Sequence, residues 1–403
     1  MFPRNLQVLL TYVSYLFLLA VLLPTNVRSQ DWQSEVLPVE LTVGYAVRAV
    51  DFNRDGRLDI AIVDSKRILW LESPSWKVHV IHSTPAAKSD NVSMAPLDID
   101  SDGDVDLAIG YDWQPNNTQS GGAIGWLESP TDPKQTWTLH TLSDNEPTTH
   151  RMNWADLDRN GRPELIVAPL KGRLSREPGF EDRGVRLLAF TIPKDPINQP
   201  WPSRVLDESM HVMHNFEVVD FDQDKHDDLL VASFEGVHSL LFDGSSGTTA
   251  SRMQVGIGHE GKAPARGSSE VRIGKLPNNR RFVATIEPWH GNQVVVYEQS
   301  DSMPWKRLMI DDQLKWGHAV ACCNLDDDPE DELVIGVRDD AAPHRCGVRI
   351  YDRSTEMGWQ RTLVSPGQVA VEDLICTDLN GDGKLEIVAV GRATHNAVIY
   401  WPK

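Results

Sequence analysis

The sequence predicts an all-β fold, a seven-bladed β-propeller of four-stranded blades. Three observations predict it: an acidic loop that recurs six times, a tryptophan-led strand that recurs along the chain, and a repeat of about 50 residues. The chain has 403 residues, which is ample for a large packed core. We therefore expect one propeller over residues 30–403, preceded by a signal peptide over residues 1–29.

The acidic loops carry oxygen side chains at positions 1, 3, 5 and 9, usually with glycine at position 6. Calcium takes roughly six to eight oxygen ligands, and glycine permits the sharp turn between them. A short apolar β-branched segment follows each loop, whereas an EF-hand would need helices. The sequence predicts structural calcium in up to six loops, the alternative being solvated acidic turns without metal. The predicted ligands are Asp51, Asn53, Asp55, Asp59, Asp98, Asp100, Asp102, Asp106, Asp156, Asp158, Asn160, Glu164, Asp220, Asp222, Asp224, Asp228, Asn324, Asp326, Asp328, Glu332, Asp378, Asn380, Asp382 and Glu386.

The second repeat is a tryptophan followed by an alternating strand, and residues 251–257 take its place in one blade. The first of these strands, from Trp32, precedes every other strand, and the last repeat stops after its third strand. We therefore expect the N-terminal strand to supply the outer strand of blade seven and close the ring. Closure removes the exposed sheet edges along the ring.

The N-terminal segment has the features of a secretory signal. Arg4 precedes an apolar run from Val8 to Leu23, and a small-residue pattern ends at Ser29. The run is short for a membrane span of roughly 20 residues, which favours cleavage after about Ser29 over an uncleaved anchor. We expect a secreted or periplasmic protein with no membrane span after cleavage.

The net charge argues against some classes of partner, and the cysteine spacing argues against a zinc site. The formal net charge is -19, and such an acidic surface argues against nucleic acid and anionic membranes. Four cysteines match no zinc-binding spacing. In an exported protein they could form disulfides, and the alternative is that they are small buried hydrophobic side chains. They are Cys322, Cys323, Cys346 and Cys376.

A ring of ionisable side chains is expected at one mouth of the central channel. The residue six before the first loop ligand should lie at the same height in every blade, because the blades are related by rotation about one axis. Clustered ionisable groups in a concave site indicate function, the alternative being a polar, water-filled channel without activity. The residues at this position are Tyr45, Val92, His150, His214, Glu270, His318 and Glu372.

The ring residues offer nitrogen and oxygen ligands that suit zinc, manganese or calcium. A histidine serves as base or acid near neutral pH, while turn arginines suit a carboxylate and exposed Trp113 and Trp289 suit sugar stacking. The predicted channel-metal ligands are His150, His214, Glu270, His318 and Glu372. The predicted catalytic residues are His150, His290, Tyr45, Arg151, Arg338 and Arg392, and the predicted substrate-binding residues are Lys171, Trp289, Asn292 and His395.

Two resemblances follow from these motifs. The acidic loops resemble FG-GAP/VCBS repeats, the calcium-loop blades also found in integrin propellers. Residues 150–156 (HRMNWAD), 269–276 (SEVRIGKL), 282–297 (FVATIEPWHGNQVVVY) and 391–401 (GRATHNAVIYW) resemble the propeller domain of aldos-2-ulose dehydratase and, more distantly, rhamnosyl-glucuronate polysaccharide lyases. The resemblance implies elimination on a sugar, with a histidine acid/base and a metal ion at the channel mouth. The dehydratase's extra cupin domains are not in this chain, so its isomerase activity is not expected.

The sequence is compatible with three candidate functions. We expect an exported carbohydrate-active enzyme, a carbon-oxygen lyase or dehydratase acting on a sugar or polysaccharide. The alternative is a non-catalytic calcium-binding propeller for carbohydrate or protein binding or adhesion, which would not need titratable groups in its channel. A glycoside hydrolase would need two carboxylates across the scissile bond, and Glu270 and Glu372 would leave the histidines unexplained.

Overall fold

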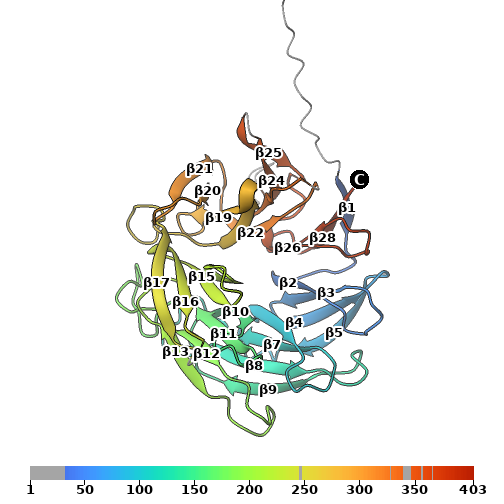
Figure 1. Cartoon of the computed structure of the whole chain (residues 1–403). Helices are drawn as coiled ribbons and strands as arrows, with labels where there is room; N and C mark the ends of the chain where they lie inside the picture. The colour runs from blue at the N-terminus through green and yellow to red at the C-terminus, as the bar shows by residue number, and fades with distance from the viewer. Residues whose placement is uncertain (1–31, 245–246, 327, 339–345, 355–356, 365) are drawn as a thin grey trace, which may run out of the picture.

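The protein is described by a computed structural model that covers residues 32–244, 247–326, 328–338, 346–354, 357–364 and 366–403. Seven four-stranded antiparallel sheets form a ring, as predicted (Figure 1). The predicted signal peptide, residues 1–29, lies outside the described residues. Within them, no helix has both the length and the apolar character needed to cross a membrane.

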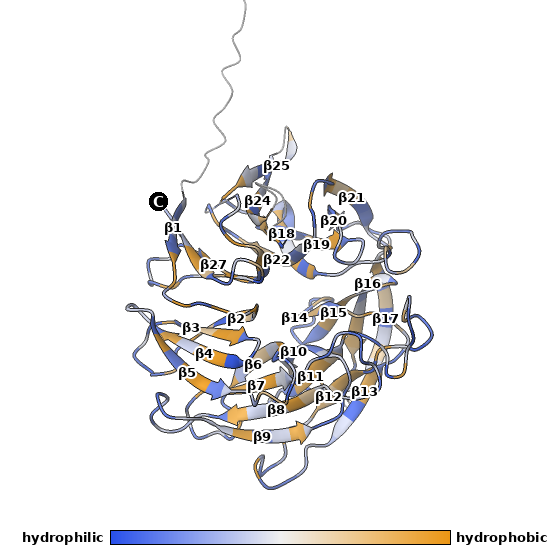
Figure 2. Cartoon of the chain, turned by 180° about the vertical axis from the view of Figure 1, so that it is seen from behind, coloured by the Kyte–Doolittle hydropathy of each residue, from blue (hydrophilic) through white to orange (hydrophobic). Residues whose placement is uncertain are grey.

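Each blade runs from an innermost strand to an outermost one (Figure 2). The innermost strands are β2 (Gly44–Val50), β6 (Ser93–Leu97), β10 (Thr149–Ala155), β14 (Asn215–Val219), β18 (Val271–Leu276), β22 (Gly317–Cys323) and β26 (Val371–Thr377). The second strands are β3 (Asp59–Asp64), β7 (Asp106–Tyr111), β11 (Glu164–Pro169), β15 (Asp228–Ser233), β19 (Arg280–Glu287), β23 (Glu332–Val337) and β27 (Glu386–Gly391). The third strands are β4 (Arg67–Glu72), β8 (Ala123–Glu128), β12 (Leu187–Phe190), β16 (Gly236–Phe242), β20 (Gln293–Glu298), β24 (Gly347–Ser354) and β28 (Ala397–Pro402). The outermost strands are β5 (Lys77–Ser83), β9 (Thr138–Ser143), β13 (Ser203–Asp207), β17 (Thr249–Gly256), β21 (Lys306–Asp311), β25 (Gly358–Leu363) and β1 (Trp32–Val36).

The burial of the strands explains their composition. Six of the second strands are buried at every position, because both faces of a blade pack against neighbouring blades. Blade five carries none of the six acidic loops, and a 3-10 turn at Pro277–Asn279 joins its first two strands.

The recurring tryptophans join neighbouring blades. Trp137 of blade two lies with its ring centre 5.5 Å from that of Phe52 in blade one. Trp359 of blade six makes the same edge contact with Phe282 of blade five, at 5.1 Å. These rings fill the space between two sheets, so the tryptophan recurs because each one packs its blade against the next.

The N-terminal strand closes the ring, as predicted. Strand β1 pairs antiparallel with β28, so that Trp32 lies opposite Pro402 and Val36 opposite Val398. The Nε1 of Trp401 also donates to Glu35 Oε2 at 2.9 Å. In Figure 1 the blue N-terminal strand lies beside the red C-terminal strand.

Deletion of residues 32–38 is expected to destabilise the propeller, because it exposes the backbone groups along the edge of β28. We expect a melting temperature lower by roughly 10 °C or more, together with aggregation, since several kcal/mol of strand pairing is lost. Differential scanning calorimetry and light scattering measure both. A protein that begins at residue 32 is the control, and a deletion variant that stays monomeric with unchanged melting would refute this form of closure.

Cys322, Cys323 and Cys376 form no disulfide in this fold. Cys346 is buried, and Cys322 and Cys376 line the central channel. Burial raises the pKa of the Cys322 thiol well above its ordinary value. Cys322 therefore behaves as a small, protonated side chain, in keeping with the alternative of small hydrophobic side chains.

Candidate functional site

The acidic loops connect the first and second strands of six blades. The carboxylate that ends each loop accepts the backbone N–H of the loop's second residue, at 2.7 to 3.2 Å in five loops. Asp51 and Asp98 accept the N–H of Gly56 and Gly103, and both glycines have the positive φ that the pattern predicted. These bonds fold the ligand oxygens of each loop toward one point.

The loops have the donor set of a hard cation. In blade two, carboxylate oxygens of Asp98, Asp100 and Asp106 lie within 4.8 Å of one another, and the loops of blades four and six contain equivalent groups. Buried oxygens of Asp98, Asp220 and Glu386 have no hydrogen-bond partner. Burial raises the pKa of Asp106 to about 7. Buried carboxylates of this kind need a compensating positive charge, which calcium would supply.

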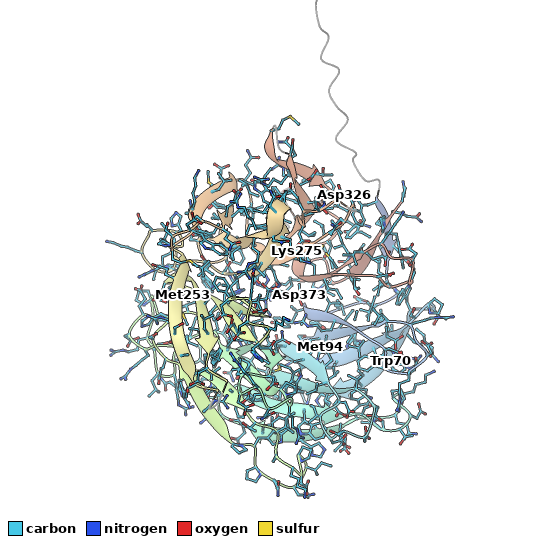
Figure 3. All side chains as sticks on the ribbon, viewed as in Figure 1. Trp70, Met94, Met253, Lys275, Asp326 and Asp373 are labelled. Carbon is cyan, nitrogen blue, oxygen red and sulfur yellow. The ribbon has the colours of Figure 1, made fainter. Side chains whose placement is uncertain are left out.

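Bulges at the start of the inner strands aim the ring residues. The pairing register shifts at Tyr45, His150, His318 and Glu372, which leaves each of these residues outside the regular ladder. A bulge of this kind redirects one side chain without disturbing the rest of the strand. Figure 3 shows Asp373, the neighbour of Glu372, near the centre of the ring, whereas Met253 and Trp70 lie in the surrounding blades.

Three histidines form a compact cluster in this ring. One nitrogen from each of His214, His290 and His318 lies within 4.8 Å of the other two. The Nε2 atoms of His214 and His290 are 2.7 Å apart, and the ring centres of His290 and His318 are 4.9 Å apart. Because zinc–nitrogen bonds are about 2.0–2.1 Å long, three imidazoles at this spacing can share one ion. His290 is only half-buried, so solvent can reach the cluster from its side.

Oxygen atoms lie next to the Nδ1 atoms of two of the cluster histidines. The Nδ1 of His318 donates to the backbone carbonyl of Glu372 at 2.6 Å. The Nδ1 of His214 lies 2.7 Å from Glu270 Oε1, and Glu270 also accepts from Asn215. For His318 the hydrogen bond at Nδ1 leaves Nε2 free as a ligand, an arrangement common among metal-binding histidines.

A tight turn places His290 in the cluster. His290 has a φ of 51°, in the left-handed region, and Gly291 follows it. A Cβ on Gly291 would lie 2.3 Å from the carbonyl oxygen of Glu287, so only glycine fits there. The buried Glu287 is itself anchored by Arg307, Tyr297 and Ser268. This turn was expected at the mouth, but His290 was not predicted as a metal ligand.

The remaining predicted metal ligands have other partners. His150 stacks on Trp113 and its Nδ1 donates to the carbonyl of His214 at 3.0 Å, so it lies beside the cluster. Glu270 lies behind His214. Glu372 accepts from Arg338 and Arg392, both at 3.1 Å, and is 3.8 Å from His318 Nε2. The compact group is therefore smaller than the predicted five residues and includes His290 instead.

Burial sets the protonation of the site. Desolvation lowers the pKa of His150, His214, His290 and His318 well below its ordinary value, and the nearby Arg151 or Arg338 lowers it further. All four imidazoles are therefore neutral near pH 7, the form that accepts a proton or binds a metal. Burial raises the pKa of Tyr45, whose hydroxyl donates to Asp90 at 2.9 Å.

Aromatic rings surround the cluster. Trp113 and Trp289 are half-buried instead of exposed as expected: Trp113 stacks on His150, and Trp289 on His290 at 4.3 Å. The exposed aromatic residue is Trp316, which is 50% exposed and lies under the guanidinium of Arg338 at 4.7 Å. Trp316 was not predicted, although it lies two residues before His318 at the start of an inner strand.

Two predicted substrate-binding residues have structural contacts instead. The Nδ2 of Asn292 donates to the carbonyl of Asp312. The Nδ1 of His395 donates to the carbonyl of Thr42, next to the ring closure. Both side chains therefore hold the backbone of neighbouring turns.

Lys171 lies in the long segment of blade three that joins β11 to β12. Its Nζ lies 3.7 Å from the centre of the Phe180 ring and donates to Asn116 Oδ1 at 2.7 Å. Phe180 belongs to a small apolar cluster against which Trp113 and Trp289 pack. Burial lowers the pKa of Lys171 to about 8.

This pKa predicts a measurable pH dependence of stability. Above about pH 8 the folded state has lost the proton of Lys171, while the unfolded state keeps it until about pH 10.4. The free energy of unfolding of the wild type should therefore rise relative to Lys171→Met across this range, by up to about 1.4 kcal/mol per pH unit. Urea titrations from pH 7 to pH 10 test this, and parallel profiles for the two proteins would contradict it.

The fold is that of a seven-bladed propeller, and residues 51–109 match a family profile described as "FG-GAP-like repeat". A second family profile, described as "Aldos-2-ulose dehydratase, beta-propeller domain", matches residues 121–300, the segment that contains His150, His214, Glu270 and His290. The aldos-2-ulose dehydratase of Phanerodontia chrysosporium is 26% identical over 353 residues, which cover 80% of this chain. The matched region spans only 37% of that relative.

Solved structures show the same fold in distant proteins. A chain of the mitotic checkpoint complex matches with a TM-score of 0.55 and 11% identity, covering 98% of this chain and 99% of that one. The Myceliophteria thermophila Cps50 (Swd1) β-propeller domain matches with a TM-score of 0.51 and 11% identity, covering 92% and 100%. These matches show the propeller fold alone.

Proposed function

We propose that this chain is a carbohydrate-active enzyme, a lyase or dehydratase that eliminates across a sugar C–O bond. The observation that carries the proposal is the cluster of His214, His290 and His318, three neutral imidazoles at the mouth of a propeller channel. The similarity of residues 121–300 to the aldos-2-ulose dehydratase propeller supports the same chemistry.

The cluster suits one divalent ion. His214, His290 and His318 would hold it, and three histidine ligands with a further open position are typical of catalytic zinc. A bound divalent ion supplies Lewis-acid stabilisation of the oxyanion that develops during elimination. Glu270 and the carbonyl of Glu372 keep the two buried imidazoles aimed at the cluster.

His150 is the proposed proton acceptor. Its Nδ1–H donates to a backbone carbonyl, which fixes the tautomer and leaves Nε2 unprotonated. This Nε2 would take the proton on the carbon next to the sugar carbonyl or carboxylate, while the C–O bond breaks and its oxygen leaves with a proton. The raised pKa of Tyr45 keeps its hydroxyl protonated near neutral pH, so it cannot act as the base. We assign Tyr45 the role of proton donor to the leaving oxygen.

Substrate would be held by the charged and aromatic rim. Arg338 and Arg392 each keep further N–H donors beyond the bond to Glu372, and these suit a substrate carboxylate. Arg151 lies deeper in the channel, beside Glu270, and would act on the histidines through its charge. The exposed face of Trp316 suits a sugar ring.

We also propose structural calcium in the six acidic loops and export through the N-terminal signal. The orphaned buried carboxylate oxygens in the loops support the calcium proposal. The apolar run before Ser29 supports export.

A screen of sugars and uronate polysaccharides tests the proposed function. We expect a new absorbance at about 235 nm, where an unsaturated uronate product absorbs, and we expect it to depend on one transition-metal equivalent. Sugar binding without turnover, in protein with the cluster metal confirmed present, would instead favour the non-catalytic carbohydrate-binding propeller.

A further inference from the structure

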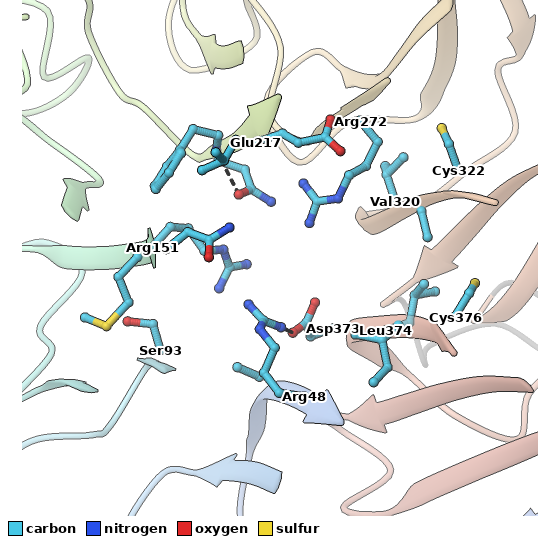
Figure 4. A pocket seen from close by; sticks show the side chains of 18 residues that line it. Arg48, Ser93, Arg151, Glu217, Arg272, Val320, Cys322, Asp373, Leu374 and Cys376 are labelled. Atoms are coloured by element: carbon cyan, nitrogen blue, oxygen red, sulfur yellow. Dashed lines mark hydrogen bonds and ion pairs between the residues drawn. The ribbon is translucent and has the colours of Figure 1, made fainter. Parts of the chain in front are cut away.

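A cavity of about 370 Å³ lies in the central channel and is lined by residues from all seven inner strands. It is separate from the three-histidine cluster, none of whose members lines it. Three arginines from different blades line it: Arg48 of β2, Arg151 of β10 and Arg272 of β18. Figure 4 shows the side chains of Arg48 and Arg272 extending from opposite walls toward the middle of this cavity.

The three guanidinium groups have unused donors. Arg48 donates from Nη1 alone, to its own strand's Val47 carbonyl at 2.6 Å and to Asp373 at 3.1 Å. Arg272 likewise donates from Nη1 alone, to the carbonyl of Val271 at 2.6 Å. Arg151 is only 9% exposed and makes no hydrogen bond to any described residue. A buried guanidinium without a hydrogen-bond acceptor is costly unless an anion or water completes it.

The acidic groups of the cavity do not fill this need. Asp373 accepts both the N–H of Val47 and Arg48 with a single oxygen. Glu217 accepts the N–H of Ile273 at 2.8 Å, and its burial raises the pKa of this carboxyl to about 7, so that much of its charge is absent near neutral pH.

Glu270 is the only carboxylate within 4 Å of Arg151 among the described residues, and it lies 3.8 Å away. Its Oε2 accepts from Asn215, and its Oε1 lies 2.7 Å from His214 Nδ1. The three arginines therefore bring more N–H donors to the cavity than its carboxylates accept.

We propose that this channel cavity binds one small oxyanion, such as sulfate or the carboxylate groups of a small organic acid, between Arg48, Arg151 and Arg272. The planar guanidinium suits oxyanions because two of its N–H groups can donate to two oxygens at once. The ligand would complete the donors that Arg48, Arg151 and Arg272 leave unused.

Isothermal titration calorimetry with sulfate, and separately with malonate, tests the proposal on the whole protein in calcium-containing buffer. We expect one equivalent of anion to bind, and the stronger of the two ligands identifies the inorganic or organic class. Arg272→Gln and Arg151→Gln should each weaken binding at least tenfold, because each removes charge-assisted hydrogen bonds. The exposed Arg57→Gln is the matched control and should bind as the wild type does.

A crystal soaked in selenate gives a second, direct measurement. We expect an anomalous peak in the cavity, between the side chains of Arg48, Arg151 and Arg272. Absence of heat with both anions, binding that both cavity variants leave unchanged, or a selenate peak found only outside the channel would each overturn the proposal. Arg48 and Arg272 have no proposed role at the histidine cluster, so the Arg272→Gln result separates this proposal from the proposed catalytic function.

Discussion

Chelation of calcium by EGTA is expected to lower the melting temperature of the propeller by roughly 10–20 °C. Each loop joins the first strand of a blade to the second, and in blades two, four and six the folded loop brings three carboxylate oxygens within 4.8 Å of one another. An ion that binds only this folded arrangement stabilises it by about 3–4 kcal/mol at a concentration far above its dissociation constant. With six loops in one ring, these contributions accumulate. Calorimetry with and without added calcium measures the shift.

A single loop provides the matched comparison. Asp98→Ala removes the first ligand of blade two, including an oxygen that is buried and has no hydrogen-bond partner. It should lower the melting temperature in calcium but change it little in EGTA. The exposed Asp301→Ala lies in blade five, which has no acidic loop, and should melt as the wild type does in both buffers. An unchanged melting curve in EGTA, with calcium confirmed absent, would rule out the structural role.

Replacement of His318 by alanine is expected to reduce turnover below about 1% of the wild-type rate. The same variant should lose one equivalent of transition metal, because the cluster needs all three imidazoles to enclose the ion. The calcium-dependent melting temperature should stay close to that of the wild type, since the acidic loops lie at the opposite end of the inner strands. A rate assay, elemental analysis and calorimetry on one preparation measure the turnover, the metal content and the melting temperature.

His238→Ala is the control for loss of a buried histidine. His238 is 7% exposed and lies in β16, outside the cluster. It should keep both the metal and the turnover, whatever its effect on stability. If His318→Ala retained wild-type activity, or if both variants lost activity equally, the histidine cluster would not be the catalytic centre.

The fold was predictable because each blade repeats the same local signals. The acidic loop marks the turn after an inner strand, and the tryptophan marks an outer strand that packs on the preceding blade, as Trp137 does on Phe52. Ring closure by the strand from Trp32 followed from counting strands. The position of the inner-strand ring followed from rotational symmetry, and His150, His214 and His318 do lie close together in the structure.

The composition of the cluster was not predictable to the same degree. His290 enters it through a left-handed turn, and the direction of a side chain on such a turn is not fixed by strand alternation. Glu372 lies at the predicted position along its inner strand, but it forms ion pairs with Arg338 and Arg392. Sequence spacing does not show how far the side chains of these two turn arginines extend. The half-burial of Trp113 and Trp289 depends on contacts with histidines from other blades, a stacked contact with His150 for Trp113 and an edge contact with His214 for Trp289, and such contacts are tertiary packing.

The central claim is that His214, His290 and His318 hold one divalent metal at the channel mouth. Anomalous diffraction at the zinc and manganese edges, from crystals grown with both metals and with calcium, tests it most directly. We predict one transition-metal peak within about 2.3 Å of the Nε2 atoms of His214 and His290, distinct from calcium in the acidic loops. A histidine cluster that stays free of metal in such crystals, while the loops are filled, would contradict the account.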